Sequence, residues 1–182
     1  RIPEGEYNQR DFINECTKDR FSMLSELRNI ALSVKNEDYR RVLDTFFNDS
    51  TLIDRFAFMP ASKLYHHSYI GGLLEHTLGV VKLCIAMADY YEGIDRDLLI
   101  TAAILHDLGK IYEYKVSAII DFTLEGNMLG QIYLTQRAVN EILERAGIED
   151  NDMKIKLMHV ILSHHGSIER GAFVRPMVPE AI

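Results

Sequence analysis

Apolar residues recur at intervals of three and four over long stretches of the chain, which is the spacing that one face of an amphipathic helix requires. Segments 10–34 and 36–47 follow this pattern, and a shorter helix is expected over 51–58. The polar sequence Asn48-Asp49-Ser50 separates the last two and supplies side chains that commonly cap the start of a helix. The first third of the chain is therefore predicted to be helical.

The most apolar segment, 73–91, is predicted to form a long helix that follows Gly71-Gly72. Its apolar residues cover nearly the whole circumference, so we expect this helix to be buried on most sides. A second buried helix is predicted over 95–105, with Asp95 or Asp97 placed to cap its start or to complement its dipole. These two consecutive helices are expected to form the centre of the core.

The hydrophobic period changes between 111 and 124, where short runs of tyrosine, valine, isoleucine and phenylalanine predict two short strands in a small hairpin. Helices are expected again over 129–146, ended by Gly147, and over 150–162. From 166 onward, glycine, proline and mixed polarity indicate a loop. The pattern as a whole predicts an all-α fold, a single helical bundle with a minor β-hairpin.

Composition narrows the class of protein. The 182 residues are 47% hydrophobic and 26% charged, which suits one sizeable core. Apolar stretches break well before the roughly 20 residues of a membrane span, and the polar start is unlike a signal peptide. Two distant cysteines, Cys16 and Cys84, are expected to be reduced thiols, so a cytoplasmic protein is predicted. Residues 1–7 lack a periodic pattern and resemble a linker, so the domain is expected to cover 8–182.

The formal net charge of −7 argues against a domain that binds nucleic acid by bulk electrostatics. It leaves open a nucleotide, or the 3′ end of an RNA, that metal ions attract. Divalent cations are often the largest local charges in such a site.

All seven histidines lie between His66 and His165, and His106-Asp107 stands where a buried helix ends. A buried carboxylate is costly unless it is paired, hydrogen-bonded or bound to a metal. Because helices joined by short connections are antiparallel, His76 near the start of the preceding helix is expected beside this pair. A later helix end supplies three more histidines, His159, His164 and His165.

A lone histidine on an apolar helix is usually a satisfied core residue, but this concentration of histidines favours a metal site. Neutral imidazole and carboxylate ligands suit Mn²⁺, Fe²⁺, Co²⁺, Ni²⁺ or Zn²⁺. The predicted ligands for one or two ions are His76, His106, Asp107, His159, His164 and His165. His66 and His67 are expected at the rim, as capping groups or facing the substrate.

Four segments carry a family resemblance: HHSYIGGLLEHT at 66–77, AILHDLGK at 103–110, LG at 129–130 and SHHG at 163–166. Together they resemble the HD superfamily of metal-dependent phosphohydrolases. Within it, they are similar to the YhaM-type 3′→5′ exoribonucleases over nearly the whole chain. The resemblance implies an enzyme that hydrolyses the phosphodiester bonds of single-stranded RNA from its 3′ end, with water activated by a metal.

The resemblance also implies residue roles. Asp107 would bridge two ions, His76 and His106 would hold the first, and His159 with His164 or His165 the second. Lys110 would meet a phosphate oxygen, so Asp107 and Lys110 are the expected catalytic residues. The expected substrate-binding residues are His67, Gly72, Lys110 and Gln131.

Two departures from the family pattern bear on these expectations. Members with two metals place a histidine where this chain has Gln131, so the second ion is expected to be weakened or lost. The family's last aspartate would fall beyond Ile182, so we expect the domain to be truncated at its carboxyl end. The exoribonucleases also carry an OB-type nucleic-acid-binding domain upstream, which we expect in the full-length protein.

Two alternatives remain open at the level of sequence. The first is a nucleotide phosphohydrolase or a signalling-nucleotide phosphodiesterase on the same fold, because fold alone does not choose the substrate. The second is a degenerate HD domain that serves as a binding module. Metal identity does not follow from the sequence, and a homo-oligomer is compatible with it.

Overall fold

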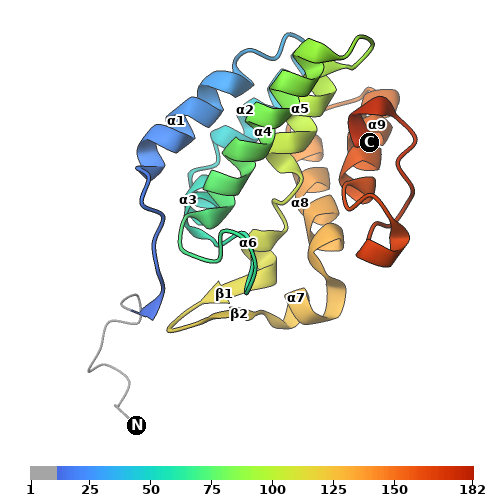
Figure 1. Cartoon of the computed structure of the whole chain (residues 1–182). Coiled ribbons are helices and arrows are strands. Elements are labelled where there is room, and N and C mark those ends of the chain that lie inside the picture. Colours follow the sequence, from blue (N-terminus) through green and yellow to red (C-terminus); the bar gives the residue numbers. More distant parts are fainter. Residues whose placement is uncertain (1–11) are drawn as a thin grey trace.

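Helices account for most of residues 12–182, the part of the chain that this computed structural model describes (Figure 1). The α-helices are α1 (Arg20–Ala31), α2 (Glu37–Phe47), α3 (Ser50–Phe58), α4 (Gly72–Tyr90), α5 (Arg96–Leu105), α6 (Lys110–Glu113), α7 (Leu124–Leu129), α8 (Gln131–Arg145) and α9 (Asn151–Ser163). Two short 3₁₀-helices, η2 (Ile168–Arg170) and η3 (Pro179–Ala181), follow. The predicted all-α bundle is confirmed, and the expected linker over 1–7 lies outside the described residues.

Short polar side chains cap most of the long helices. Asp19, Asn36, Asp49, Asp95 and Asp150 each accept hydrogen bonds from backbone amides in the first turn of the helix that follows. Such a bond satisfies an amide that has no partner within the helix. The predicted restart at Asn48-Asp49-Ser50 is confirmed, and Asp95 and Asp150 are the residues that cap α5 and α9.

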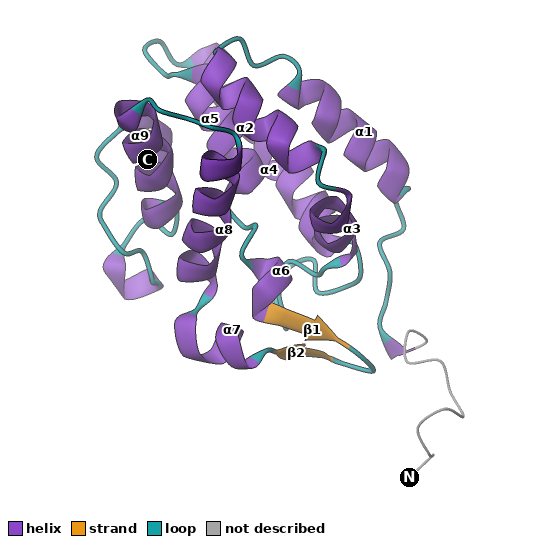
Figure 2. Ribbon diagram, turned by 180° about the vertical axis from the view of Figure 1, so that it is seen from behind, coloured by secondary structure: helices purple, strands orange, loops and turns teal. Residues whose placement is uncertain are grey.

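The core is centred on α4 and α5, which lie side by side in both views (Figures 1 and 2). Helices α1 and α3 cover α4, whereas α9 packs against α5 and α8 packs against α9. Buried side chains such as Leu73, Leu74, Ile100 and Ile104 fill the space between them. Because α4 and α5 are antiparallel, the start of α4 meets the end of α5 within this core.

The predicted hairpin is confirmed. Strands β1 (Tyr114–Val116) and β2 (Ile120–Phe122) pair antiparallel, with Lys115 opposite Asp121. Figure 2 shows the hairpin at one end of the bundle, next to α6 and α7. It follows directly from the end of α6, so it lies near the carboxyl end of α5.

The first predicted helix is too long. The helix expected over 10–34 starts only at Arg20. Residues 10–11 lie outside the described range, and among residues 12–19 Glu15 forms an isolated bridge with Ile70, where the Cys16 amide donates to the Ile70 carbonyl oxygen at 2.8 Å. This pairing satisfies backbone groups that a longer helix would have used. Phe21, which the periodicity assigned to the apolar face, is exposed.

Burial of α4 was also overestimated. The first half of this helix is buried, but Leu83 is 70% exposed and Met87 is half-exposed. Within residues 12–182, the elements that cover α4 do so mainly along its first half, so apolar composition alone did not predict burial.

Two short helices, α6 and α7, were not predicted. A helix of four to six residues is too short to display a period of 3.6, and Ile111 was instead assigned to the β region. The helix expected over 129–146 is α8, which begins two residues later than expected because Gly130, with a φ of +75°, separates it from α7. None of the helices in the described part of the chain is long and apolar enough to cross a membrane.

Candidate metal centre

Three side chains from two helix ends meet in the core. His76 lies in the second turn of α4, and His106 and Asp107 follow the last residue of α5. The Nε2 atoms of His76 and His106 are 3.2 Å apart, and they lie 3.4 Å and 3.3 Å from Asp107 Oδ2. Each of the three residues therefore offers one potential ligand atom, and these three atoms lie within 4.8 Å of one another. The predicted proximity of these three residues is confirmed.

Backbone carbonyl groups orient two of the imidazole rings. The Nδ1 atom of His106 is 2.8 Å from the Ala103 carbonyl oxygen, and that of His164 is 2.6 Å from the Ile161 carbonyl oxygen. A proton on Nδ1 donated to a carbonyl leaves Nε2 as the free nitrogen, which is the usual arrangement of a metal-binding histidine.

His164, at the end of α9, approaches the same carboxylate from a third direction. Its Nε2 is 3.9 Å from Asp107 Oδ1 and, although buried, has no hydrogen-bond partner among the residues that the structure describes. Buried polar atoms without a partner are rare in proteins, and a site for an ion is one explanation for such an atom. Imidazole nitrogens with one carboxylate oxygen are ligands that a divalent first-row metal accepts, so these residues fit such an ion.

Electrostatics keep Asp107 ionised in spite of its burial. The residue is 5% exposed, and burial by itself raises the pKa of its carboxyl group. The charge and hydrogen bond of His106, together with the charge of Lys110, outweigh that effect and hold the pKa well below its usual range. Conversely, burial tends to lower the pKa of His106, but the neighbouring Asp107 outweighs it and raises that pKa.

Burial has the opposite consequence for the two outer imidazoles. It lowers the pKa of His76 to about 4 and that of His164 to about 4. Both rings are therefore neutral at pH 7, the form in which a histidine binds a metal.

Gln131, the first residue of α8, is a hydrogen-bond donor to Asp107. Its Nε2 lies 2.8 Å from Asp107 Oδ1 and 3.1 Å from Thr135 Oγ1, while its Oε1 is buried without a partner in the described structure. The close approach of α8 depends on Gly109, because a Cβ there would lie 2.3 Å from the Thr135 nitrogen. The role of Gly109 was not recognised from the sequence.

Lys110 is close to two carboxylates. Its ammonium nitrogen lies 3.9 Å from Asp107 Oδ1 and 3.9 Å from Glu113 Oε2, and its side chain is only 13% exposed. Glu113 was not singled out by sequence reasoning, although it is buried, and burial raises its pKa. Lys110 also lies 5.7 Å from the centre of the Tyr114 ring.

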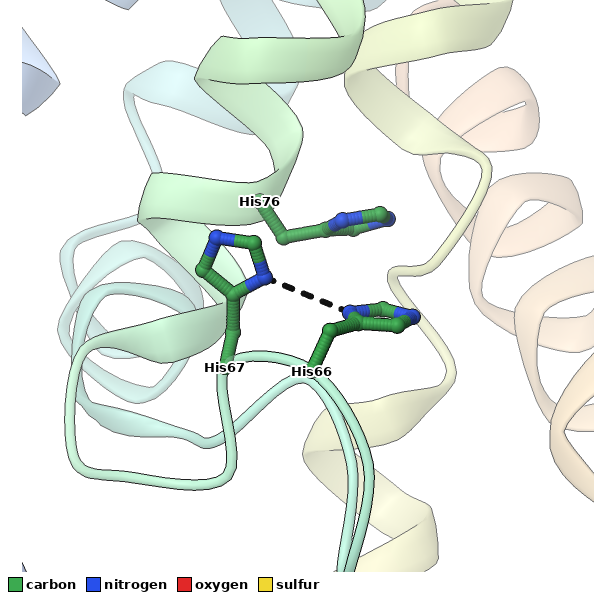
Figure 3. Close-up of side chains that lie close together, drawn as sticks. All are labelled: His66, His67 and His76. Carbon is green, nitrogen blue, oxygen red and sulfur yellow. Dashed lines mark hydrogen bonds between the residues drawn. The ribbon is translucent and has the colours of Figure 1, made fainter.

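A second group of imidazoles, His66, His67 and His76, shares His76 with the first group and is drawn in Figure 3. The His66 ring stacks on the His76 ring with centroids 4.8 Å apart, and His66 Nδ1 is 3.2 Å from His67 Nδ1. Ligand atoms of these three residues also lie within 4.8 Å of one another. The sequence analysis named His67 among the expected substrate-binding residues. In the structure His66 lines the cleft, and His67 lies beside His66.

Three further predicted site residues have different surroundings. His159 Nε2 accepts a hydrogen bond from the Met177 amide at 2.9 Å, and the structure does not bring this residue into either imidazole group. Gly72 is buried against the backbone of His67 rather than facing the cleft. His165 lies in the cleft wall, with its ring centroid 4.4 Å from that of His164.

The site opens into a cleft of about 780 Å³. Its polar end is lined by His66, His76, His106, Asp107, Lys110 and His164. Its apolar end is lined by Val80, Cys84, Met87, Ile94, Leu99 and Ala102. A pocket of this size with a few convergent polar groups has the form of a small-molecule or nucleotide site.

Comparison with known families gives two matches. A model described as the HD domain matches residues 73–182, which is more than half of the chain. A second model, described as a putative helicase, matches residues 16–92, which is less than half.

Curated relatives include proteins named 3′-5′ exoribonuclease YhaM. The one from Listeria welshimeri is 33% identical over 174 residues, covering 96% of this chain and 55% of the relative. The one from Bacillus subtilis is 34% identical over 174 residues, covering 96% and 54%. The one from Geobacillus sp. is 32% identical over 171 residues, covering 94% and 52%. This chain thus spans about half the length of these relatives, and no solved structure gives a significant match.

Proposed function

The chain belongs to the HD domain family, and on that premise we propose that it hydrolyses phosphodiester bonds with a divalent metal, as the catalytic domain of a 3′→5′ exoribonuclease. One observation carries this conclusion: ligand atoms of His76, His106 and Asp107 converge within 4.8 Å at the floor of a cleft. Burying an ionised carboxylate beside two imidazoles is costly unless the group holds a cation, which would explain why these side chains converge there.

The family implies a divalent metal, and we propose that His76, His106 and Asp107 hold it, with His164 approaching from α9. Manganese, iron, cobalt, nickel and zinc all accept this donor set. When bound, such an ion polarises a phosphoryl oxygen and makes water nucleophilic at neutral pH. We propose one firmly held ion, because Gln131 presents an N–H donor to Asp107 where a second ion would need a ligand.

The surrounding residues have distinct tasks in this proposal. Gln131 holds Asp107 Oδ1, so that Oδ2 stays directed toward the two Nε2 atoms of His76 and His106. Lys110 provides a positive charge in the cleft beside this carboxylate, positioned to bind a phosphate oxygen of the substrate. Asp107 and Lys110 are the residues that we expect to matter most for catalysis.

The names of the relatives support RNA as the substrate. A nucleotide phosphohydrolase or signalling-nucleotide phosphodiesterase is the second candidate, because a cleft of about 780 Å³ and the net charge of −7 suit a small ligand. The convergent ligand set favours either enzyme over a binding module. We also propose a cytoplasmic location and an upstream nucleic-acid-binding domain, for which the greater length of the relatives leaves room.

Hydrolysis assays separate these candidates. The purified chain would be stripped of metal, loaded in turn with each of the five ions, and given 5′-labelled single-stranded RNA or a panel of nucleotides. We expect stepwise shortening of the RNA from its 3′ end. Hydrolysis of nucleotides alone would favour the second candidate, and absence of both metal binding and hydrolysis would favour the binding module.

Substitution Asp107→Asn tests the role of the carboxylate. We expect hydrolysis to fall to background and bound metal to be lost, because the variant removes the charged ligand while keeping the size of the side chain. The far-ultraviolet circular dichroism spectrum should stay helical. Asp121→Asn is the matched control, since Asp121 lies on the exposed hairpin and pairs with Lys63 at 2.8 Å. Metal-dependent activity that persists in Asp107→Asn would refute the proposed site.

A further inference from the structure

One side of the cleft is formed by residues 61–69, here called the rim loop, which connects α3 to α4. Ser62 Oγ accepts a hydrogen bond from the Tyr65 amide at 3.0 Å and donates one to the His66 carbonyl oxygen at 2.8 Å. The Ala61 amide donates to the His67 carbonyl oxygen at 3.1 Å. These three bonds define the conformation of the loop and hence the direction of its side chains.

Two local features hold the rim loop against α4. His67 has a φ of +53°, the one positive value for a non-glycine residue in the range 12–182. A Cβ on Gly72 would lie 2.0 Å from the His67 carbonyl oxygen, so only glycine allows this approach. Backbone strain of this kind persists where the surrounding structure requires it, and it is concentrated at functional sites. Here it brings the loop against the first turns of α4, where His76 lies.

The result is that His66 shares the cleft wall with the proposed metal ligands. In Figure 3 the ring of His66 lies below that of His76, and His67 stands beside them. The contact of 3.2 Å between the Nδ1 atoms of His66 and His67 needs one proton. If Nδ1 of His67 donates that proton, Nδ1 of His66 is the acceptor. A neutral His66 then carries its own proton on Nε2, the nitrogen that remains for a ligand in the cleft.

Tyr65 stands next to this imidazole at the mouth of the cleft. It is 86% exposed, so its ring gains little stability from burial within the chain. Its neighbour Leu64 is 77% exposed but is not part of the cleft wall. An exposed aromatic ring beside a hydrogen-bond donor is the combination by which proteins bind single strands, because the ring stacks on a base while the donor contacts a phosphate.

We infer that the rim loop binds the 3′ end of single-stranded RNA, with Tyr65 stacked on a base and His66 Nε2 donating to a phosphate oxygen. His67 is a positioning residue that sets the orientation and the proton of His66. Because every base has a face to stack on, this mode of binding predicts little sequence preference. Its link to catalysis rests on the function proposed above, but RNA binding can be measured without hydrolysis.

Fluorescence anisotropy of a 5′-labelled single-stranded RNA, in the presence of a chelator that prevents cleavage, tests the role of Tyr65. Tyr65→Ala is expected to weaken binding by roughly fivefold or more, the lower end of what stacking on one base contributes. Tyr65→Phe keeps the ring and should bind as the wild type does, as should the matched control Leu64→Ala. Equal affinity of Tyr65→Ala and the wild type would overturn the inference, as would an equal loss in Tyr65→Phe or no RNA binding by the wild type.

Steady-state hydrolysis tests the role of His66. His66→Ala is expected to raise KM for RNA several-fold, and His66→Gln should restore it, because the glutamine amide places a donor near the position of Nε2. No change in His66→Ala would refute the phosphate contact. If RNA binding depends on Tyr65 but the protein does not hydrolyse RNA, the proposed function is wrong and the proposed RNA contact of the rim loop stands. If hydrolysis is the same in Tyr65→Ala, His66→Ala and the wild type, the proposed function stands and the RNA contact of the rim loop is wrong.

Discussion

Substitution Gly109→Ala sets two opposing effects against each other at the base of the candidate metal centre. Gly109 has a helical conformation, with a φ of −59°, so alanine fits the backbone there. By restricting the unfolded chain, a compatible glycine-to-alanine change stabilises a protein by about 0.4–1 kcal/mol. Local conformation alone therefore predicts a slightly more stable variant.

Packing against α8 predicts the opposite, by a larger amount. The added Cβ would lie 2.3 Å from the Thr135 nitrogen and 2.6 Å from the Gln131 carbonyl oxygen, and real Cβ contacts essentially never fall under 3.0 Å. Since 3.0 − 2.3 = 0.7, the two backbones must separate by at least 0.7 Å. Both neighbours are backbone atoms of a helix, so they cannot move aside by rotating a side chain.

The separation also stretches two hydrogen bonds, from the Gly109 amide to Thr135 Oγ1 at 2.9 Å and from Gln131 to Asp107 at 2.8 Å. Overpacking costs about 1–3 kcal/mol, and weakening a hydrogen bond to a buried charge adds about 1.5 kcal/mol or more. After subtraction of the entropic gain, we expect Gly109→Ala to lower the free energy of unfolding by about 2–4 kcal/mol.

Urea unfolding of the metal-free protein, followed by circular dichroism, measures this change without a contribution from bound ligand. If the same protein is unfolded by heat, the expected fall in Tm for a chain of this size is roughly 5–15 °C. Gly79→Ala is the matched control, because a Cβ at Gly79 meets nothing within 4 Å and α4 should gain stability. If Gly109→Ala proved as stable as Gly79→Ala, the proposed dependence of the centre on close approach of α8 would be wrong.

Two other predictions concern the scaffold. Asp49 caps α3 and pairs with Arg145 at 2.8 Å, and the Leu52 amide and Arg145 lower the pKa of its carboxyl group. Asparagine can still cap the helix but cannot pair with Arg145, so Asp49→Asn should lower the free energy of unfolding by up to about 1 kcal/mol at pH 7. The pKa of Asp49 is lower in the folded than in the unfolded protein, so the difference in free energy of unfolding between wild type and Asp49→Asn should be fully present above the ordinary aspartate pKa of about 3.9. It should vanish as the pH falls through the folded-state pKa, and urea titrations at several pH values would measure it. Phe56 is fully buried, with its ring 5.4 Å from that of Phe46, so Phe56→Ala should cost about 3–5 kcal/mol in the same assay, whereas Phe21→Ala on the surface should cost almost nothing.

Local features of the sequence predicted much of the scaffold. Asn36 and Asp49 cap helices that begin where the pattern indicated, and the change of period after residue 111 marks the hairpin. The pairing of His76 with His106-Asp107 was predicted as well, because two consecutive helices joined by a short connection leave few arrangements open. Each of these inferences depends on residues close in the chain or on one neighbouring helix.

Packing between distant segments decided the rest. The choice of His66 over His67 as the cleft residue follows from a rim loop held by Ser62 and by the absence of a side chain at Gly72, neither of which has a periodic signature. Likewise, His159 shares a helix end with His164, yet its Nε2 accepts from the Met177 amide. The two residues are five positions apart, so at 3.6 residues per turn their side chains leave the helix roughly 140° apart, and the Met177 backbone packs on the side of His159.

By itself, then, the sequence predicted most of the long helices, where most of them begin, and that His76 lies beside His106-Asp107. Only the tertiary structure decided that Gln131 donates to Asp107 and that α8 can approach because Gly109 has no side chain. The physical reason is one of range. Caps and periodicity act over a few residues, whereas the protonation and partners of a buried group depend on charges and donors that arrive from elsewhere in the chain.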